Sequence, residues 1–310
     1  MFKVKTDTIK IPKSILLLTL VALLAGCQPA QKQLAAPNET NHIISGKPVA
    51  ATNIFSKRVI YLALGVKWET GPAGNSVTKS RNCTASALSP TILITAAHCV
   101  IGMKPSDVAA VLSNNPWNHT LNFSEWVKVT QIIIHEDFID STNDPKNGMM
   151  INDLALIKLA QPLSPDRVSR FAPDQHFDKN LAIIAVGYGK RSILKLEQEP
   201  DPKKIDPQSE TLLSFIAKSV ENFDVAQPTF SISQLDQTGI CEGDSGGPSL
   251  IYDSKLKDFV ILGITSFYGT RNDEMAASDP KNIYNCSGHG IFSNALYFAD
   301  WIERTQARLN

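Results

Sequence analysis

The sequence predicts an all-β fold, a barrel or a sandwich, that ends in one α-helix. Short segments rich in apolar and β-branched residues recur between clusters of Pro, Gly, Asn and Asp, as strands do between turns. Helical periodicity is scarce until the end of the chain. Many short strands without alternating helices are typical of barrels and sandwiches. The segments expected to be strands are 59–64, 91–95, 126–134, 154–159, 181–186 and 259–265.

The composition describes a folded protein with no nucleic-acid signature. Of the 310 residues, 43% are hydrophobic and 19% are charged, so the chain can bury a core. Basic and acidic residues each number 30, which gives a formal net charge of zero and no basic stripe. With 17 Gly and 18 Pro, collagen-like and low-complexity classes are excluded. The odd count of 5 Cys needs an explanation.

The amino terminus has the pattern of an export signal. Four lysines precede an apolar run over residues 15–24, and this run is about half the ~20 residues that cross a bilayer. The segment that ends at Cys27 (LAGC) resembles a bacterial lipobox, which implies removal of residues 1–26 and lipidation of Cys27. The alternative is an ordinary secretory signal with a chance cysteine. Residues 27–42 are polar and are expected to form a tether and propeptide.

The remaining elements follow from turns and periodicity. Residues 249–252 and 259–265 flank a polar turn, as the arms of a hairpin do. Ser293 or Asn294 is expected to cap a helix that runs to Thr305 with one apolar side. Segments with no continuous apolar face are expected to be surface loops, namely 69–81, 139–148, 190–210 and 270–284.

Three separate segments carry residue types that act together in nucleophilic catalysis. They are TAAHC around His98, NDLALI around Asp153 and CEGDSGGP around Ser245, and each adjoins a strand-like segment. A serine hydroxyl needs an imidazole to take its proton, and the imidazole needs a buried carboxylate to fix its tautomer. Singly, each residue is more often structural: a packed histidine, a turn aspartate, a glycine-rich turn. Their joint presence in one chain favours the catalytic interpretation.

These segments resemble the trypsin-like serine peptidases of the chymotrypsin fold. The resemblance runs from residue 43 to about 301, and GDSGGP is its most specific motif. It implies two antiparallel six-stranded β-barrels packed together with a C-terminal α-helix, over a peptidase domain of residues 43–310. It further implies peptide hydrolysis through an acyl-enzyme, with His98 as general base, Asp153 as orienting acid and Ser245 as nucleophile. Backbone N–H groups of Gly243 and Ser245 would form the oxyanion hole.

The family pattern also assigns the cysteines. It implies a bridge between Cys83 and Cys99 and another between Cys241 and Cys286. The fifth cysteine is then Cys27, the proposed lipid site. Disulfides fit an exported chain, because oxidising compartments preserve them.

Activation by cleavage is a further implication. Residues 43–46 (IISG) resemble the new terminus of the family's activated enzymes, whose ammonium at Ile43 would pair with Asp244. His42 precedes the cut where many relatives have Arg or Lys, so the activating protease is open. The other interpretation is that Ile43 starts an ordinary strand. No cysteine would hold residues 27–42 to the domain after the cut, so activation would release it from the membrane.

The specificity pocket is expected to lack a charge. Gly239 lies six residues before the nucleophile, where trypsin has Asp, and the register set by Cys241 keeps Asp236 out of that position. Residues lining the walls would be Phe267, Tyr268 and Gly290. The expectation is an open slot, narrowed by Tyr268, for apolar or aromatic residues rather than Lys or Arg. His289 raises the lesser alternative of an acidic preference.

Two other classes of protein remain as alternatives. The nucleophile segment also fits the G-x-S-x-G elbow of α/β-hydrolases, but those need the order Ser, acid, His and alternating helices. A non-catalytic surface protein on the peptidase fold is the second. No cofactor and no metal are expected. The expected partners are a protein or peptide substrate, an activating protease and a membrane reached through Cys27, with no nucleic acid.

Overall fold

The computed structural model describes residues 46–71, 74–114, 125–140, 150–173, 181–189, 213–236, 238–268, 286 and 288–310. All described residues belong to one compact unit, which lies within Thr40–Asn310. The loops expected at 190–210 and 270–284, the lipobox and Ile43 lie outside the described residues. None of the described helices has both the length and the apolar character that a bilayer span requires.

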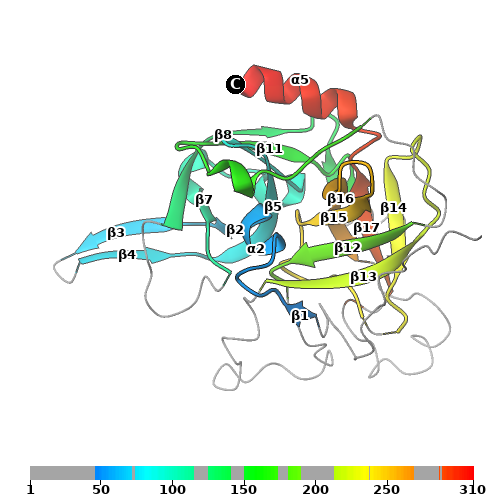
Figure 1. The fold of residues 1–310 in the computed structure, drawn as a ribbon. Helices are drawn as coiled ribbons and strands as arrows, with labels where there is room; N and C mark the ends of the chain where they lie inside the picture. Colours follow the sequence, from blue (N-terminus) through cyan, green and yellow to red (C-terminus); the bar gives the residue numbers. More distant parts are fainter. Residues whose placement is uncertain are drawn as a thin grey trace, which may run out of the picture. The chain divides into compact units, whose positions relative to one another are not determined.

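The first half of the domain is a closed antiparallel barrel of six strands, in the order β11-β6-β5-β2-β7-β8 (Figure 1). Four of the expected strands, 59–64, 91–95, 126–134 and 154–159, are here as β2, β6, β8 and β11. The strands of this barrel are β2 (Val59–Leu64), β5 (Arg81–Ser89), β6 (Ile92–Thr95), β7 (Val108–Val111), β8 (Trp126–Ile134) and β11 (Ala155–Leu159).

The second half is also a closed barrel. Its sheet runs β1-β13-β12-β15-β16-β17-β14, and a further pairing of β13 with β14 closes six of the strands while β1 stays at the edge. The predicted hairpin is β15–β16. The strands are β1 (Lys47–Pro48), β12 (Ala182–Gly187), β13 (Ser214–Glu221), β14 (Thr229–Ser233), β15 (Pro248–Asp253), β16 (Asp258–Tyr268) and β17 (His289–Asn294). The predicted fold class, two six-stranded barrels with a terminal helix, is confirmed.

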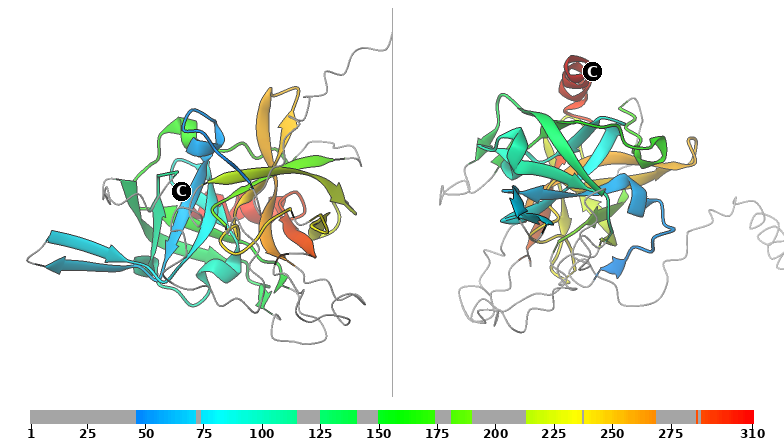
Figure 2. Two further views of the ribbon diagram at one scale, coloured as in Figure 1. Left: turned by 90° about the horizontal axis from the view of Figure 1, so that it is seen from below. Right: turned by 90° about the vertical axis from the view of Figure 1, so that its left-hand side faces the viewer.

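Two short ribbons stand beside the barrels. β3 (Lys67–Gly71) pairs with β4 (Gly74–Thr78), and this ribbon extends away from the first barrel (Figures 1 and 2). The expectation of a surface loop over 69–81 is therefore wrong in that the segment forms strands, which satisfy their backbone groups across their own hairpin. β9 (Ile139–Asp140) pairs with β10 (Met150–Ile151) just before Asp153.

The helices are few and short except at the carboxyl end. α5 starts several residues later than predicted, because Asn294 ends β17 and its side-chain Nδ2 donates to the carbonyls of Asp224 at 3.0 Å and Gln227 at 2.9 Å. Its apolar side is buried as expected. The helices are α2 (Phe55–Arg58), α3 (Ala97–Val100), η1 (Pro105–Asp107), η3 (Pro165–Arg167) and α5 (Ala299–Leu309).

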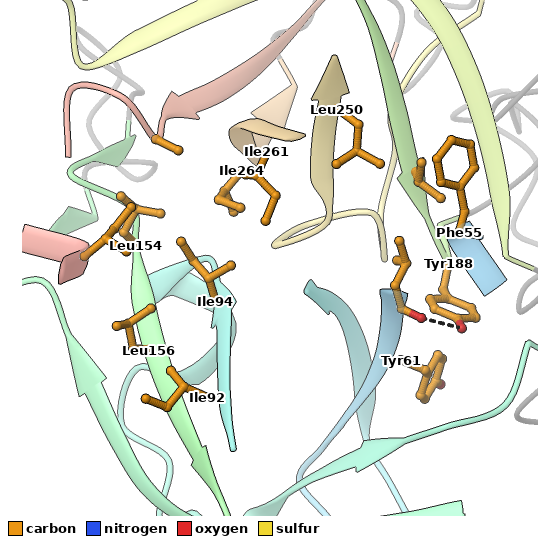
Figure 3. Close-up of a cluster of buried hydrophobic side chains, with 14 of the residues drawn as sticks. Phe55, Tyr61, Ile92, Ile94, Leu154, Leu156, Tyr188, Leu250, Ile261 and Ile264 are labelled. Atoms are coloured by element: carbon orange, nitrogen blue, oxygen red, sulfur yellow. Dashed lines mark hydrogen bonds between the residues drawn. The ribbon is translucent and has the colours of Figure 1, made fainter. Parts of the chain in front are cut away.

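The largest hydrophobic cluster joins the two barrels. It takes Tyr61, Ile94 and Leu154 from the first half and Tyr188 and Ile264 from the second (Figure 3). The rings of Tyr61 and Tyr188 meet edge to face with centroids 5.3 Å apart. Side chains of this size at the junction exclude water and hold the barrels rigidly against each other. The turns that leave the strands at this junction are therefore fixed relative to one another.

Candidate active site

Strand pairing brings His98 and Asp153 together. His98 lies on α3, directly after β6, and Asp153 lies directly before β11. Since β6 and β11 are antiparallel neighbours with Thr95 opposite Ala155, the end of one strand and the start of the other meet at the same edge. His98 and Asp153, which are 55 residues apart in sequence, therefore lie side by side at this edge of the first barrel.

The carboxylate of Asp153 makes contacts on both oxygens. Its Oδ2 lies 2.8 Å from Nδ1 of His98, and its Oδ1 accepts from the backbone N–H of His98 at 2.9 Å. The hydroxyl of Ser266, at the end of β16 in the second barrel, donates to Oδ2 as well. Asp153 is only 1% exposed, so these donors replace the water that a buried carboxylate requires. The ring of His98 is held with Nδ1 toward the acid and Nε2 on its other side.

The Cys83–Cys99 disulfide lies between this pair and the Ser245 turn. Sγ of Cys99 is 3.8 Å from Nε2 of His98 and 3.7 Å from the carbonyl oxygen of Ser245. The turn is fixed by Thr84 of β5, whose N–H donates to the Ser245 carbonyl at 2.8 Å and whose hydroxyl donates to the Gly243 carbonyl at 2.8 Å. Among the hydrogen bonds of the described residues, none joins Ser245 Oγ to His98, and both residues contact Sγ of Cys99.

Two glycines make the Ser245 turn possible. Gly243 and Gly246 have φ angles of +95° and +80°, in the region that favours glycine. A Cβ at Gly246 would lie 2.0 Å from Oγ1 of Thr95, and one at Gly243 would lie 2.8 Å from Nδ2 of Asn82. The turn therefore approaches the first barrel more closely than any other residue type allows.

The turn leaves two backbone donors available. The N–H groups of Asp244, Gly246 and Gly247 donate to neighbouring carbonyls. Among the hydrogen bonds of the described residues, none uses the N–H of Gly243 or of Ser245. Two N–H groups in one sharp turn can receive a single oxygen that carries negative charge.

A comparison with known families agrees with this arrangement. The family model described as Trypsin matches residues 68–302 of the chain. The chain belongs to the trypsin family of serine endopeptidases.

Individual trypsin-family relatives are distant in sequence. Trypsin from Sarcophaga bullata is 27% identical over 235 residues, which cover 74% of this chain and 81% of that protein. Ovochymase from Halocynthia roretzi is 25% identical over 236 residues, 72% of this chain and 13% of its own length. Transmembrane protease serine 11G from Mus musculus is 27% identical over 239 residues, which cover 71% of this chain and 48% of that protein. The chain thus spans about half or less of the last two. These three relatives are eukaryotic.

Asp244, next to the serine, is a buried carboxylate in this trypsin-family chain. Its Oδ1 accepts from the N–H of Gly189 at 2.8 Å and its Oδ2 from the N–H of Cys241 at 2.9 Å. A Cβ at Gly187 or at Gly189 would lie 2.2 Å from one of these oxygens. Burial raises the pKa of Asp244 to about 7, and no cation of the described residues pairs with it. The ionised form of Asp244 therefore has no counter-charge among the described residues.

The four cysteines form the two bridges that the resemblance implied. Cys83 joins Cys99 with Cα atoms 6.3 Å apart, and Cys241 joins Cys286 with Cα atoms 5.3 Å apart. Each bridge stabilises such a domain by about 2–4 kcal/mol. The pattern is consistent with an exported protein. Cys83, Cys99 and His98 also form a group spaced as metal ligands are, but disulfide sulfurs are not thiolates and do not ligate as such.

The structure shows what surrounds the two glycines expected in the pocket. Gly239 and Gly290 are both buried, and the side chain of Gln234 occupies the space where a Cβ of either would point. Asp236 is turned to the surface, where the ammonium of Lys218 lies 2.5 Å from its Oδ1. His289 is likewise exposed, with Nδ1 3.1 Å from Oε2 of Glu221.

Two of the three expected wall residues lie at the end of β16. Phe267 and Tyr268 are half-buried. The hydroxyl of Tyr268 donates to Oε1 of Glu242 at 3.4 Å, three residues before the serine. Burial and the neighbouring carboxylate raise the pKa of Tyr268 to about 12, so the phenol stays protonated and can donate. Tyr268 and Glu242 thus join the two segments expected to flank the pocket.

Three contributors to the site were not singled out from the sequence. Ser266 was missed because its contact with Asp153 crosses between the barrels. Thr84 sits next to a half-cystine in a strand of small residues. Gln234 is the polar member of an alternating pattern with Phe230 and Ile232, which signals an inward-facing position. That alternation is the one signal that could have identified it.

Proposed function

We propose that the chain hydrolyses peptide bonds with Ser245 as nucleophile, His98 as general base and Asp153 as the acid that orients the base. The observation that supports this most is the double contact of Asp153 with the Nδ1 and the backbone N–H of His98. A buried carboxylate on Nδ1 keeps the proton there and leaves the lone pair of Nε2 free to receive another. Nε2 is on the side where Cys99 Sγ approaches the Ser245 turn.

The reaction follows from these positions. Ser245 Oγ attacks the carbonyl carbon of the substrate while its proton passes to Nε2 of His98. The carbonyl oxygen takes negative charge and is stabilised by the N–H groups of Gly243 and Ser245. His98 then returns the proton to the leaving amine, which breaks the C–N bond and leaves an acyl ester on Ser245. Water, with its proton taken by His98, releases the acid and restores the serine.

Labelling with a fluorophosphonate probe tests this proposal. With the full chain cut before Ile43, we expect the probe to bond to Ser245 Oγ with release of fluoride, and peptide mapping to place the label on that residue. Heat-denatured protein is the control and should stay unlabelled. If folded, cut protein is not labelled and hydrolyses no peptide, the non-catalytic binding protein becomes the better interpretation.

We also propose that the protein is made as a zymogen activated before Ile43. In the second barrel Pro48 lies opposite Ser214, and Ser214 lies opposite Gly187, whose α-carbon abuts Asp244. Two strand spacings are about 10 Å, and five residues of extended chain reach about 17 Å. The new ammonium of Ile43 is therefore within reach of Asp244, and this pairing would supply the missing counter-charge.

The proposed substrate preference is for a neutral apolar residue before the scissile bond rather than Lys or Arg. No described carboxylate lies beside Gly239, since Asp236 is occupied at the surface by Lys218. A cationic side chain would lose its hydration there without gaining a partner.

We further propose that residues 1–26 are an export signal, that Cys27 carries a lipid and that residues 27–42 are a cleavable tether. In a bacterial host with lipoprotein processing, a fatty-acid label is expected on the intact chain and not on Cys27→Ser. Cleavage before Ile43 should move the catalytic domain to the soluble fraction, because both disulfides lie within that domain. Cut, active enzyme that stays with the membrane without another attachment would contradict the release.

A further inference from the structure

Gln234 is a polar residue on the interior face of the second barrel. In β14 and just after it, Phe230, Ile232 and Gln234 alternate inward, and Gln234 is 0% exposed. Its backbone N–H donates to the carbonyl of Gly288 at 2.9 Å, which continues the pairing of β14 with β17 by one more residue. The fold therefore points an uncharged amide to a place where a barrel normally has an apolar side chain.

The carboxamide of Gln234 is held in one orientation. Its Nε2 donates to the carbonyls of Ile240 at 3.1 Å and Cys286 at 2.7 Å, and its Oε1 accepts from the N–H of Ile240 at 2.8 Å. Both N–H groups and one acceptor position are thus used, as a buried amide requires. The contact with the Ile240 N–H fixes which end of the amide is oxygen. Gln234 therefore connects the segment before the serine to the far side of the Cys241–Cys286 bridge.

The same side chain occupies the space between the two pocket glycines. A Cβ at Gly239 would lie 2.3 Å from its Cδ, and a Cβ at Gly290 would lie 2.6 Å from its Oε1. The side chain of Ile240, 1% exposed, adds to the filling, with Cγ1 2.9 Å from the Gly290 Cβ position. The room that two glycines open is therefore taken by Gln234 and Ile240, whose atoms are closed to solvent.

We propose that Gln234 determines the substrate specificity, by forming a raised, uncharged floor that admits small aliphatic side chains such as Ala or Val before the scissile bond and excludes Phe and Tyr. This inference rests on the proposed peptidase function and narrows its apolar preference. A fully hydrogen-bonded amide does not move aside cheaply, because moving it would leave three backbone groups unsatisfied. Its lack of charge also leaves Lys and Arg without a partner.

The test compares peptides that differ only in that residue. With the full chain cut before Ile43, the wild type is expected to have a higher kcat/KM for Ala and Val peptides than for the Phe peptide. Gln234→Ala should raise the Phe-to-Ala ratio of kcat/KM about 10- to 100-fold, since one or two methylene groups of pocket space are worth that much. Gln234→Met refills the space without the hydrogen bonds that hold the amide, so its Phe-to-Ala ratio is expected to fall between those of the wild type and Gln234→Ala. Gln227→Ala, an exposed glutamine of the same barrel, is the matched control.

A folded Gln234→Ala with an unchanged ratio would overturn the proposal. Because that variant loses three hydrogen bonds and risks misfolding, a second measurement uses the wild type alone. Phosphonate probes that carry an Ala-like or a Phe-like side chain are compared for their rate of labelling, and the Ala-like probe is expected to react at least 10-fold faster, within the range that one or two methylene groups give. If the two probes react at equal rates, or the Phe-like probe reacts faster, the proposed specificity is overturned. The labelling itself would still support the proposed peptidase function. No labelling by any probe would remove the peptidase function and this inference together.

Discussion

Replacing Asp153 by Asn is expected to lower kcat about 10⁴-fold, the effect that this change has in serine peptidases with the same three groups. An Asn amide at this site can present its N–H₂ to His98 Nδ1, which would then have to accept and leave the ring proton on Nε2. The imidazole would face the serine with a donor instead of a base. The measurement is kcat and KM of the cut enzyme on one peptide, with KM expected to change little.

Two companion variants make this result interpretable. Ser245→Ala removes the nucleophile, and its kcat, expected to be about 10⁶-fold below that of the wild type, gives the residual activity without a nucleophile. Ser266→Ala removes one donor to Asp153 but keeps both contacts with His98, so its loss should be far smaller than that of Asp153→Asn. Circular dichroism should show that all three variants are folded. A folded Asp153→Asn with near wild-type kcat would refute the role given to this carboxylate.

The sequence predicted the strands whose pattern is made by large apolar residues. β2 and β8 appear with the expected bounds, because runs such as 59–64 have few alternatives to a buried strand. β5 was not expected, since its residues are mostly small or polar and carry a weak pattern. Its place depends on pairing with β2 and β6, which no local segment encodes. The late start of α5 has the same origin, in contacts of Asn294 with residues distant in sequence.

The site shows the same division. His98, Asp153 and Ser245 lie in local motifs that are visible in the sequence, and the joint presence of these motifs indicated the chemistry. What remained hidden depends on contacts between the barrels or across the pocket. Gln234 is an example: two glycines in the sequence indicate space, and only the fold shows that the side chain of Gln234 lies beside both of them.

Asp244 is expected to make the uncut chain less stable as the pH rises from 4 to 7. Burial raises its pKa from the ordinary 3.8 to about 7 in the folded chain. The folded state thus holds a proton that the unfolded state has lost above about pH 4, so stability is full below that pH and declines up to about pH 7. Roughly three pKa units correspond to a loss on the order of 4 kcal/mol in the free energy of unfolding.

The measurement is urea unfolding of the uncut chain at several pH values between 4 and 8. A Ser245→Ala background prevents self-digestion during the experiment. Because other carboxyls and histidines titrate in this range, the informative quantity is the difference from the same chain with Asp244→Asn, which carries no titrating group there. The Asn chain should lack most of the decline. Identical pH profiles for the two chains would show that Asp244 is not a strained, unpaired carboxylate before cleavage.

After cleavage the sign of the Asp244 effect should reverse. The ammonium of Ile43 would pair with the ionised carboxylate, so the cut chain should keep its stability at pH 7 and the wild type should gain activity on cleavage. In the cut enzyme Asp244→Asn should lose that gain and fall about 10²–10³-fold in kcat, the range found when one oxyanion donor is lost, because Gly243 and Ser245 flank this residue. Asp244 would thus lower the stability of the uncut chain and, after cleavage, hold the oxyanion hole in place. If the Asn variant were fully active after cleavage, the coupling between the new terminus and the oxyanion hole would be refuted.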